Sequence, residues 1–567
     1  MRLGRHPATR PGVRVSAPTA RAAEDVAAAM DSHDTTAHDS LLASAGTTLA
    51  RVTGVARVIV IAAVLGPTTF GNAFQISNSV PNLIYYGFLA GSLVSSLIVP
   101  ALVRHQHADP ARAVMIARGF LGLVLAAGAA TVPVMVLGLP LLLRLTSGGD
   151  ASAAADEQIA LVVVLAAFTA PQILLYGVAG TGAAVMYAHR RFALPSCAPA
   201  VENLGILLVF GICAATYGTG SDGEVPLGQL LLLGLGSTGA VALHAALQWF
   251  GARRCGVMLL PSRGWAVPEV RAIVARAFRS MFQAGLLAAQ TLALLVVAAQ
   301  VPGGVVALQI ALNFYFLPIA LIATPFGLAA LPRLARLHQR GEGATYWDLY
   351  VRTVMLGLFL VIPAAAGYVV LAEPIARVVG IGEMATPEGY RVVAGALAML
   401  SLGLVGAALF FISTQACYAR EDSSRPLRSM KVQTVTCLTL IALAVAYAPD
   451  AALVHLVSAA YAAGSLVGAL HLFWSLGEGA AKARRTCLRA AARVLTVTAV
   501  MVPGVLIASH TVSELVPGRL GSVLAVVAGS LTGAVVFGCV QALVRAPELR
   551  WLRSALRSPA SVMVEVP

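Results

Sequence analysis

Charged residues are scarce in this 567-residue chain, at 11%, whereas an ordinary soluble domain contains about 25%. Aromatic residues are also few, at 6%, while hydrophobic residues make up 58%. The mean hydropathy is +0.82. A soluble globular protein of this length does not have that composition, so the sequence predicts an all-α polytopic membrane protein.

Enzyme motifs are missing as well. The chain contains no H-E-x-x-H, no P-loop, no acidic metal-binding motif and no G-x-S-x-G in a suitable context. Its seven cysteines show no paired spacing and no C-x-x-C, which indicates free thiols. The predicted loops are too short for a soluble catalytic domain. We therefore expect neither catalysis nor a bound cofactor or metal.

Apolar segments of about 20 residues, long enough to cross a bilayer, recur along the chain. They predict fourteen spans: 41–65, 73–103, 114–143, 158–186, 192–217, 227–250, 272–300, 304–332, 349–372, 391–418, 430–448, 451–475, 487–509 and 520–544. Prolines within several of them predict broken helices: Pro81, Pro133, Pro171, Pro318, Pro325 and Pro363.

The net charge of +14 would suit a nucleic-acid-binding protein, but the placement of the charges argues against that. Basic residues gather in every second loop, with acidic residues between them, as the positive-inside rule requires. This alternation predicts an even number of spans and two cytoplasmic termini. Residues 1–40 lack the apolar core of a signal peptide and are predicted to form a disordered cytoplasmic tail. The alternative is a docking segment for partners or anionic lipid.

A faint internal repeat divides the chain. The segment from Gln75 to Pro100 resembles that from Gln309 to Pro332, with Gln-to-Pro distances of 25 and 23 residues. It predicts two pseudo-symmetric six-helix lobes, 41–250 and 270–475, followed by a helix pair at 487–544 and a cytoplasmic tail at 545–567. Parallel repeats of this kind are typical of transporters whose site lies between the halves. The alternative is chance similarity between apolar segments.

Two arginines, Arg51 and Arg57, lie within the first predicted span. A guanidinium at mid-bilayer depth costs about 2.5–3.5 kcal/mol on insertion scales, so it normally faces water, a partner or an anionic ligand. Six residues separate the two, which places them about 9 Å apart along a helix and about 120° around it. Both can therefore border a wide polar cavity. The alternative is snorkelling of these side chains to the membrane interface.

Amide side chains cluster in the two repeated spans. Asn78 and Asn82 lie one helical turn apart in the second span, and Asn313 follows Gln309 by one turn in the eighth. Such amides can bind sugars or phosphate, or they can hydrogen-bond between helices.

A carboxylate and an amide, Glu202 and Asn203, come early in the fifth span. They predict an ion, proton or polar site. The alternatives for Glu202 are a buried partner for an arginine and a residue still near the cytoplasmic face. Gly54, Pro81, Pro318 and Pro325 are candidate hinges, because glycine and proline loosen or interrupt a helix.

Over residues 45–430 the chain resembles the MurJ/MviN lipid II flippases of the multidrug/oligosaccharidyl-lipid/polysaccharide exporter superfamily. The matching motifs occur in the family's order: the R-x-x-G-x-x-R of Arg51, Gly54 and Arg57; Val80-Pro81-Asn82-Leu83; Ala90-Gly91-Ser92-Leu93; His189-Arg190-Arg191-Phe192-Ala193-Leu194-Pro195 with Pro199 and Asn203; Leu331-Pro332-Arg333-Leu334; and Tyr418-Ala419-Arg420-Glu421-Asp422 with Arg425-Pro426.

The resemblance implies a fold of about fourteen helices, with the C-terminal pair forming a groove for a polyprenyl tail. It also implies translocation of undecaprenyl-pyrophosphate-linked disaccharide-peptide, lipid II, across the bacterial cytoplasmic membrane by alternating access. Arg51 and Arg57 would bind the pyrophosphate, and Asn78, Asn82 and Asn313 would line the cavity.

The chain departs from the family at positions that usually carry charge: Val58, Asn72, Tyr85-Tyr86, Ala90 and Asn313. The cationic cluster is thereby reduced to two arginines. Alternatives are export of another polyprenyl-linked glycan, cation-coupled drug antiport, or a non-transporting scaffold for envelope-synthesis proteins. The sequence leaves the energy source open between a coupling ion and the membrane potential.

Overall fold

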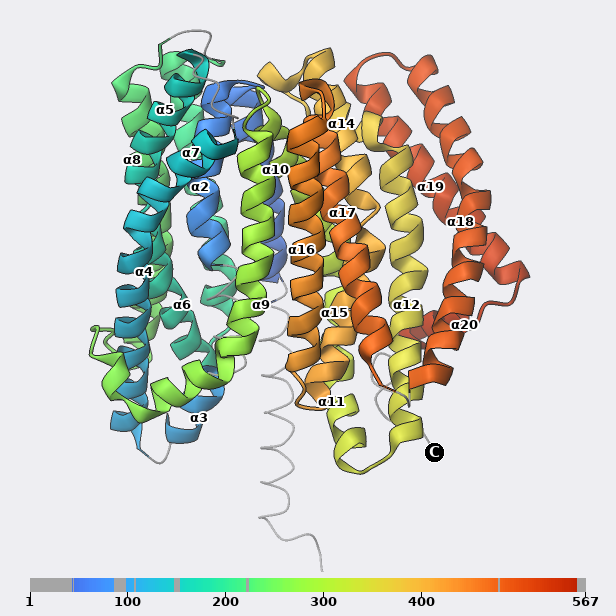
Figure 1. Cartoon of the computed structure of the whole chain (residues 1–567), viewed down its shortest axis with the longest axis horizontal. Coiled ribbons are helices and arrows are strands. Elements are labelled where there is room, and N and C mark those ends of the chain that lie inside the picture. Colours follow the sequence, from blue (N-terminus) through green and yellow to red (C-terminus); the bar gives the residue numbers. More distant parts are fainter. Residues whose placement is uncertain are drawn as a thin grey trace, which may run out of the picture.

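The computed structural model describes residue 43 and residues 45–85, 98–106, 109–146, 153–220, 224–477 and 480–557 (Figure 1). In these segments the chain is helical and forms no strand. The predicted tail at 1–40, residues 558–567 and the Ala90–Leu93 motif lie outside the described residues.

Helices of the first lobe stand on the left of Figure 1. They are the helix Ala45–Leu65, α2 (Thr69–Ile84), α3 (Val99–Gln106), α4 (Pro110–Thr146), α5 (Ala153–Thr169), α6 (Gln172–Ala188), α7 (Ala193–Tyr217) and α8 (Leu227–Arg254). A linker with the short 3-10 helix η3 (Gly264–Ala266) leads to the second lobe.

Helices of the second lobe occupy the centre and right. They are α9 (Pro268–Ala298), α10 (Gly304–Pro318), the π-helical turn η4 (Ile319–Ala323), α11 (Thr324–Gln339), α12 (Gly343–Val370), α13 (Ala372–Val379), η5 (Gly382–Met384), α14 (Pro387–Ser401), α15 (Leu404–Ala419), α16 (Ser424–Tyr447) and α17 (Asp450–Ser475). The C-terminal pair, α18 (Ala481–Leu515) and α19 (Arg519–Leu543), packs on α12 and α13, and α20 (Pro547–Arg557) follows it. The all-α fold class is confirmed, whereas the exact lobe boundaries stay a prediction.

Twelve helices in the described part of the chain are long and apolar enough to cross a membrane. The pair α14 and α15, bent by 42° at its break, gives a thirteenth span. The remaining predicted span, 73–103, passes through residues 86–97, which the structure does not describe. The protein is therefore a multi-pass membrane protein with close to the predicted number of spans.

Only some of the predicted prolines coincide with a helix break: Pro171 lies between α5 and α6, and Pro318 ends α10, whereas Pro81 lies inside α2. The predicted breaks at Pro133 and Pro363 are wrong, because α4 and α12 run through these residues without interruption. In a membrane bundle, neighbouring helices and small local adjustments accommodate the backbone carbonyl that a proline leaves unpaired. The 42° bend instead lies at Gly403, where a Cβ atom would come within 2.7 Å of the Ala462 backbone. Close approach of α17 explains this break.

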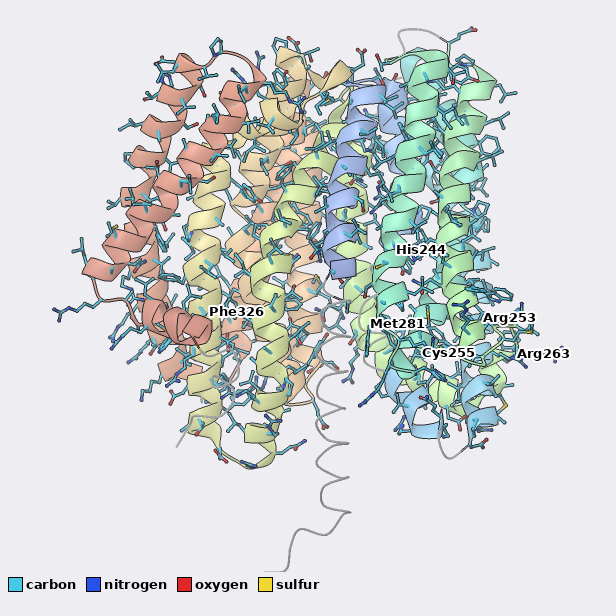
Figure 2. The ribbon with its side chains drawn as sticks, turned by 180° about the vertical axis from the view of Figure 1, so that it is seen from behind. His244, Arg253, Cys255, Arg263, Met281 and Phe326 are labelled. Carbon is cyan, nitrogen blue, oxygen red and sulfur yellow. The ribbon has the colours of Figure 1, made fainter. Side chains whose placement is uncertain are left out.

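The two ends of the bundle differ in charge. Because successive spans reverse direction, one end, at the bottom of Figure 1, carries the basic loops with Arg104, Arg190, Arg253, Arg263, Arg336, Arg425 and Arg485. We call this the basic end. The opposite, acidic end carries Asp156, Glu224, Glu373, Glu383 and Glu388. In Figure 2, Arg253 and Arg263 lie at the basic end of the first lobe, whereas His244 lies higher, inside the bundle.

Hydrogen bonds join the two lobes at the acidic end. The Asn72 amide nitrogen donates to Val301 O at 2.7 Å and to Ala299 O at 3.3 Å, and its oxygen accepts from Val305 N at 2.9 Å. Gln158 also donates to Ala299 O, at 3.1 Å. The side chain of Asn72 is fully buried. An asparagine at this position therefore ties the start of α2 to the turn between α9 and α10.

Candidate functional site

A cavity of about 840 Å³ lies between the two lobes. Its walls come from the helix Ala45–Leu65, α2, α6 and α7 on one side and from α9 and α10 on the other. The parts of α6, α7 and α10 that line it are those nearest the basic end. Its polar and charged lining residues are Thr47, Arg51, Arg57, Gln75, Asn78, Ser79, Asn82, Tyr85, Tyr187, Ser196, Asn203, Thr291, Gln309 and Asn313.

Both arginines of the first span line this cavity. Arg51 is exposed and lies closer to the basic end, while the Arg57 side chain is 18% exposed. The two side chains point in different directions around the helix, but the cavity is wide enough to contact both of these helix faces. Of the two, Arg57 lies deeper and has the more restricted environment.

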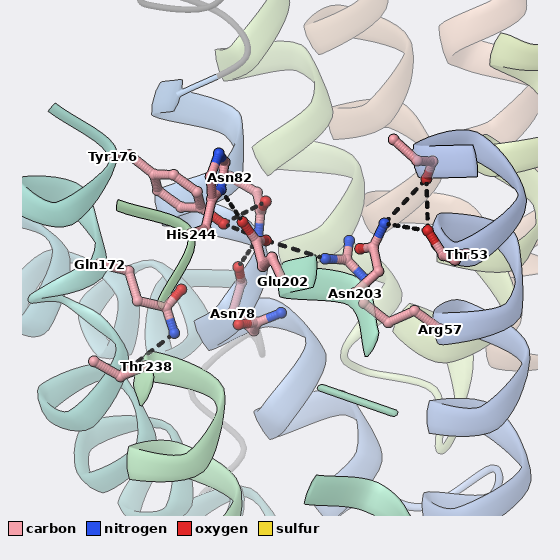
Figure 3. Close-up of polar contacts among 11 residues, drawn as sticks. Thr53, Arg57, Asn78, Asn82, Gln172, Tyr176, Glu202, Asn203, Thr238 and His244 are labelled. Atoms are coloured by element: carbon pink, nitrogen blue, oxygen red, sulfur yellow. Dashed lines mark hydrogen bonds and ion pairs between the residues drawn. The ribbon is translucent and has the colours of Figure 1, made fainter. Parts of the chain in front are cut away.

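Glu202 of α7 is the anionic partner of Arg57. The distance from Arg57 Nη1 to Glu202 Oε1 is 3.4 Å, and Glu202 is only 3% exposed (Figure 3). His244 Nδ1 lies 2.7 Å from the other carboxylate oxygen, and the Tyr176 hydroxyl donates to Oε1 at 2.8 Å. Glu202 is absent from the cavity lining. These contacts match the interpretation of Glu202 as a buried partner of an arginine, and an ion or proton site here stays a prediction.

The amides on α2 continue this network toward the cavity. The Tyr176 hydroxyl also lies 3.0 Å from Asn82 Oδ1, and the Asn82 amide nitrogen donates to Asn78 O at 2.9 Å. Asn78 Oδ1 and Gln75 Nε2 are buried and have no hydrogen-bond partner within the described part of the chain. A polar ligand in the cavity could satisfy both atoms.

The second lobe contributes a weaker set of polar groups. Asn313 donates to Gln309 O at 2.8 Å, within its own helix, and Gln309 donates across the cavity to Ser79. The structure thus places all five predicted substrate-binding residues on one cavity wall or the other. What they bind remains a prediction.

Asn203 connects two helices of the first lobe. Its amide nitrogen donates to Ala50 O at 3.0 Å and to Thr53 Oγ1 at 3.1 Å, which fixes α7 against the first helix. Gly54 lies in the same contact, and a Cβ atom there would lie 3.5 Å from Asn203 Nδ2, an ordinary van der Waals distance. Steric need therefore does not explain this glycine.

The proline hinges occupy different local structures. Pro81 lies inside α2, whereas Pro318 ends α10 and Pro325 lies in the first turn of α11. Between the last two, the helix widens into the π-turn η4, where Thr324 Oγ1 donates to Ile319 O at 3.0 Å. A π-turn is a common point of irregularity in a functional helix. The hinge function itself stays a prediction.

Sequence reasoning missed Tyr176, His244 and Gln248. All three are buried, and they come from α6 and α8, far from Arg57 in sequence. His244 gave one available signal, because an ionisable residue in an apolar span is a candidate functional group. No cluster of three or more potential metal ligands occurs among the described residues.

Comparisons with known proteins agree with one another. The family model described as "Lipid II flippase MurJ" matches residues 61–527. A probable lipid II flippase MurJ of Rhizobium meliloti is 27% identical over 436 residues, covering 76% of this chain and 79% of that protein. The lipid II flippase MurJ of Burkholderia cenocepacia is 24% identical over 399 residues, covering 68% and 74%.

Solved structures show the same fold. A lipid II flippase MurJ in an inward closed conformation aligns with a TM-score of 0.67 at 16% identity, over 89% of this chain and 99% of that one. An inward-facing multidrug resistance MATE family transporter of the MOP superfamily aligns with a TM-score of 0.61 at 16% identity, over 77% and 95%. At 16% identity, these structural similarities indicate the fold and not the substrate.

Proposed function

This chain belongs to the lipid II flippase MurJ family, and from that premise we propose that it translocates lipid II across the bacterial cytoplasmic membrane by alternating access. Lipid II is the undecaprenyl-pyrophosphate-linked precursor of peptidoglycan. The pyrophosphate is the part of this substrate that a membrane protein must neutralise in order to hold it inside the bilayer.

The observation that carries the proposal is the pair of arginines on the wall of the inter-lobe cavity. Guanidinium groups bind phosphate oxygens through charge-assisted, often bidentate hydrogen bonds. The unpaired amide atoms of Gln75 and Asn78 lie on the same wall and suit the sugar hydroxyls. A cationic drug would instead meet two positive charges, because the Glu202 carboxylate is buried behind Arg57.

The direction of access follows from the charges at the two ends. The positive-inside rule assigns the basic end, and with it the start of the first span and α20, to the cytoplasm. The cavity lies toward that end, and the Asn72 hydrogen bonds join the lobes at the opposite end. This conformation would therefore receive substrate from the cytoplasmic leaflet. Opening outward would require the Asn72 bonds to break while the lobes separate.

The polyprenyl tail needs an apolar surface outside the cavity. We assign it to the C-terminal pair, where α19 exposes Leu520, Leu524 and Leu531. Cell-wall synthesis proteins at the cytoplasmic face are partners that the function would suit. The cycle needs no catalytic group or cofactor, and either a coupling ion or the membrane potential would supply the energy.

Depletion of the protein in its own host tests this function directly. Lipid II on the outer leaflet is measured with a membrane-impermeant probe, alongside total lipid II. We expect the exposed fraction to fall while total lipid II accumulates, and a wild-type copy to restore both. Normal exposure after complete depletion would refute the lipid II function. An unchanged lipid II pool with accumulation of a different polyprenyl-linked glycan would favour export of that glycan.

A further inference from the structure

The Glu202 carboxylate contacts two other side chains in addition to Arg57. It accepts hydrogen bonds from Tyr176 at 2.8 Å and from His244 Nδ1 at 2.7 Å, whereas Arg57 is farther away at 3.4 Å. The Nε2 atom of His244 faces the Gln248 amide nitrogen at 3.4 Å, which fits an imidazole that donates through Nδ1. The carboxylate is thus held firmly by α6 and α8 and only loosely by the first helix.

Arg57 is held incompletely. Its single ion-pair distance is at the long end for a charge-assisted hydrogen bond, which is usually 2.7–2.9 Å. Its Nε atom is buried and has no hydrogen-bond partner among the described residues, although the side chain lines the cavity. A guanidinium has five N–H donors, so most of its capacity remains available to a second anion.

The Tyr176 hydroxyl has one proton and two acceptors. It lies 2.8 Å from Glu202 Oε1 and 3.0 Å from Asn82 Oδ1. The orientation of the Asn82 amide is fixed, because its nitrogen donates to Asn78 O. While the Tyr176 hydroxyl donates its proton to the charged Glu202 carboxylate, Asn82 Oδ1 can accept only a weaker, bifurcated hydrogen bond from the same hydroxyl. The network therefore has two possible arrangements: Tyr176 donates to Glu202, or it donates to Asn82. The choice depends on how strongly Glu202 attracts hydrogen-bond donors.

We propose that Glu202 is a positioning residue that acts as an internal counter-anion for Arg57 and competes with the pyrophosphate of the substrate for it. This inference rests on the proposed function, because it names the group that the substrate must displace. In the empty cavity Glu202 neutralises Arg57 and keeps it in place. When the pyrophosphate arrives, Arg57 turns toward it, and Glu202 keeps Tyr176 and His244.

Competition of this kind lowers affinity and favours release. A transporter that bound its substrate too tightly in one conformation would be slow to let it go in the next. Removing the competitor should therefore tighten binding and slow turnover together. If Glu202 had only a structural role, its removal would change the affinity in the opposite direction, because loss of its contacts would disorder Arg57 and weaken substrate binding.

The substitution Glu202→Gln tests the proposal with little disturbance. The glutamine oxygen can accept from His244, its nitrogen can donate to Tyr176, and Tyr176 can then donate to Asn82 Oδ1. These three side chains therefore stay paired. The Arg57 guanidinium loses its anion, but it lines the cavity and can meet water or substrate there. We expect lipid II to bind the full-length protein in nanodiscs roughly five- to tenfold more tightly, the effect of removing a competing ion pair. We also expect a lower maximal transport rate and a lower KM.

Glu202→Asp provides a second variant, should the glutamine protein fail to fold. The shorter carboxylate is drawn away from Arg57 by the fixed α7 backbone, so we expect tighter binding by about two- to threefold. Glu269→Gln is the matched control. It removes a bidentate pair with Arg112, at 2.7–2.9 Å, on the basic end and away from the cavity, and should leave affinity unchanged.

Arg57→Ala separates the two claims. If this variant binds lipid II as wild type does, the proposed site for the pyrophosphate is wrong. If it binds weakly, and Glu202→Gln binds with unchanged or reduced affinity, the site stands and the competition is refuted. In the double variant with Arg57→Ala, Glu202→Gln should no longer tighten binding, because the shared partner is gone. Tightening that persists there would also contradict the proposal.

Discussion

The two walls of the cavity carry similar helices but different charges. The first-lobe wall has Arg51 and Arg57, with Asn78 and Asn82 beside them. The second-lobe wall, from α9 and α10, offers Thr291, Gln309 and Asn313 among apolar residues that include Leu287, Leu312 and Phe316. Both lobes contribute repeated segments here, with Gln75 on one wall and Gln309 on the other. Positive charge lies on the first wall alone among the lining residues described.

From this asymmetry we expect the first lobe to hold the anionic part of the substrate. An anionic group is bound where the cations are, so the pyrophosphate should stay with the first lobe throughout the cycle. The second lobe then supplies shape and a few hydrogen bonds, and it can move relative to the bound group without breaking an ion pair. The competing anion Glu202 lies buried behind the first wall, whereas no carboxylate lines the second wall in the part of the chain that the structure describes.

The largest effect is expected from Arg57→Ala, which removes the deeper charge of the first wall. We expect lipid II transport in proteoliposomes to fall by about a hundredfold, because the loss of charge-assisted bonds to phosphate is worth a few kcal/mol. The protein should also be less stable by about 1–3 kcal/mol, since the buried Glu202 carboxylate would keep Tyr176 and His244 but lose its arginine. Thermal unfolding in detergent measures that loss.

The double variant Arg57→Ala with Glu202→Gln is the control for stability. It removes the orphaned charge, so it should unfold close to the wild-type temperature and still fail to transport. Recovery of transport in this variant would show that the loss came from misfolding and that the first wall does not depend on Arg57.

A smaller effect is expected from Arg51→Ala. This arginine is exposed and forms no ion pair with a carboxylate of the described residues, so its removal should leave stability unchanged. We expect transport to fall about three- to tenfold, with a weaker dependence of lipid II binding on salt concentration. A loss as large as that of Arg57→Ala would mean that the two charges act as one unit.

The smallest effect is expected on the second wall. Asn313→Ala should change lipid II affinity by about twofold or less, because its amide already bonds within its own helix. The matching change on the first wall, Asn78→Ala, should cost about three- to tenfold, because its buried oxygen is available to the ligand. The affinity of lipid II for the two variants, each as full-length protein in nanodiscs, is the measurement that compares them. Equal losses would remove the asymmetry between the walls.

Composition and motif order predicted the fold class well, because long apolar segments and alternating loop charges depend only on local sequence. The positions of Arg51 and Arg57 on the cavity could be predicted because a guanidinium within the bilayer needs water, a partner or an anionic ligand. The predicted breaks at Pro133 and Pro363 failed, and the bend at Gly403 was missed, because contacts with other helices decide them.

The site was harder to predict in full. Glu202 could be identified as a candidate, but its partners Tyr176 and His244 lie on two other helices and meet it only in the folded bundle. Asn72 departs from the charged pattern of the family, yet the structure gives it three hydrogen bonds between the lobes. Sequence shows which groups are unusual, while their pairing needs the packing of the helices.

Transport of lipid II by the purified full-length protein in proteoliposomes tests whether Arg57 binds the substrate that crosses the bilayer. The measured quantity is the rate at which labelled lipid II crosses the bilayer, for the wild type and for the stable double variant Arg57→Ala with Glu202→Gln. We expect fast crossing with the wild type and a rate near that of protein-free vesicles with the variant. Equal rates for the two proteins, or no crossing with the wild type, would contradict this expectation.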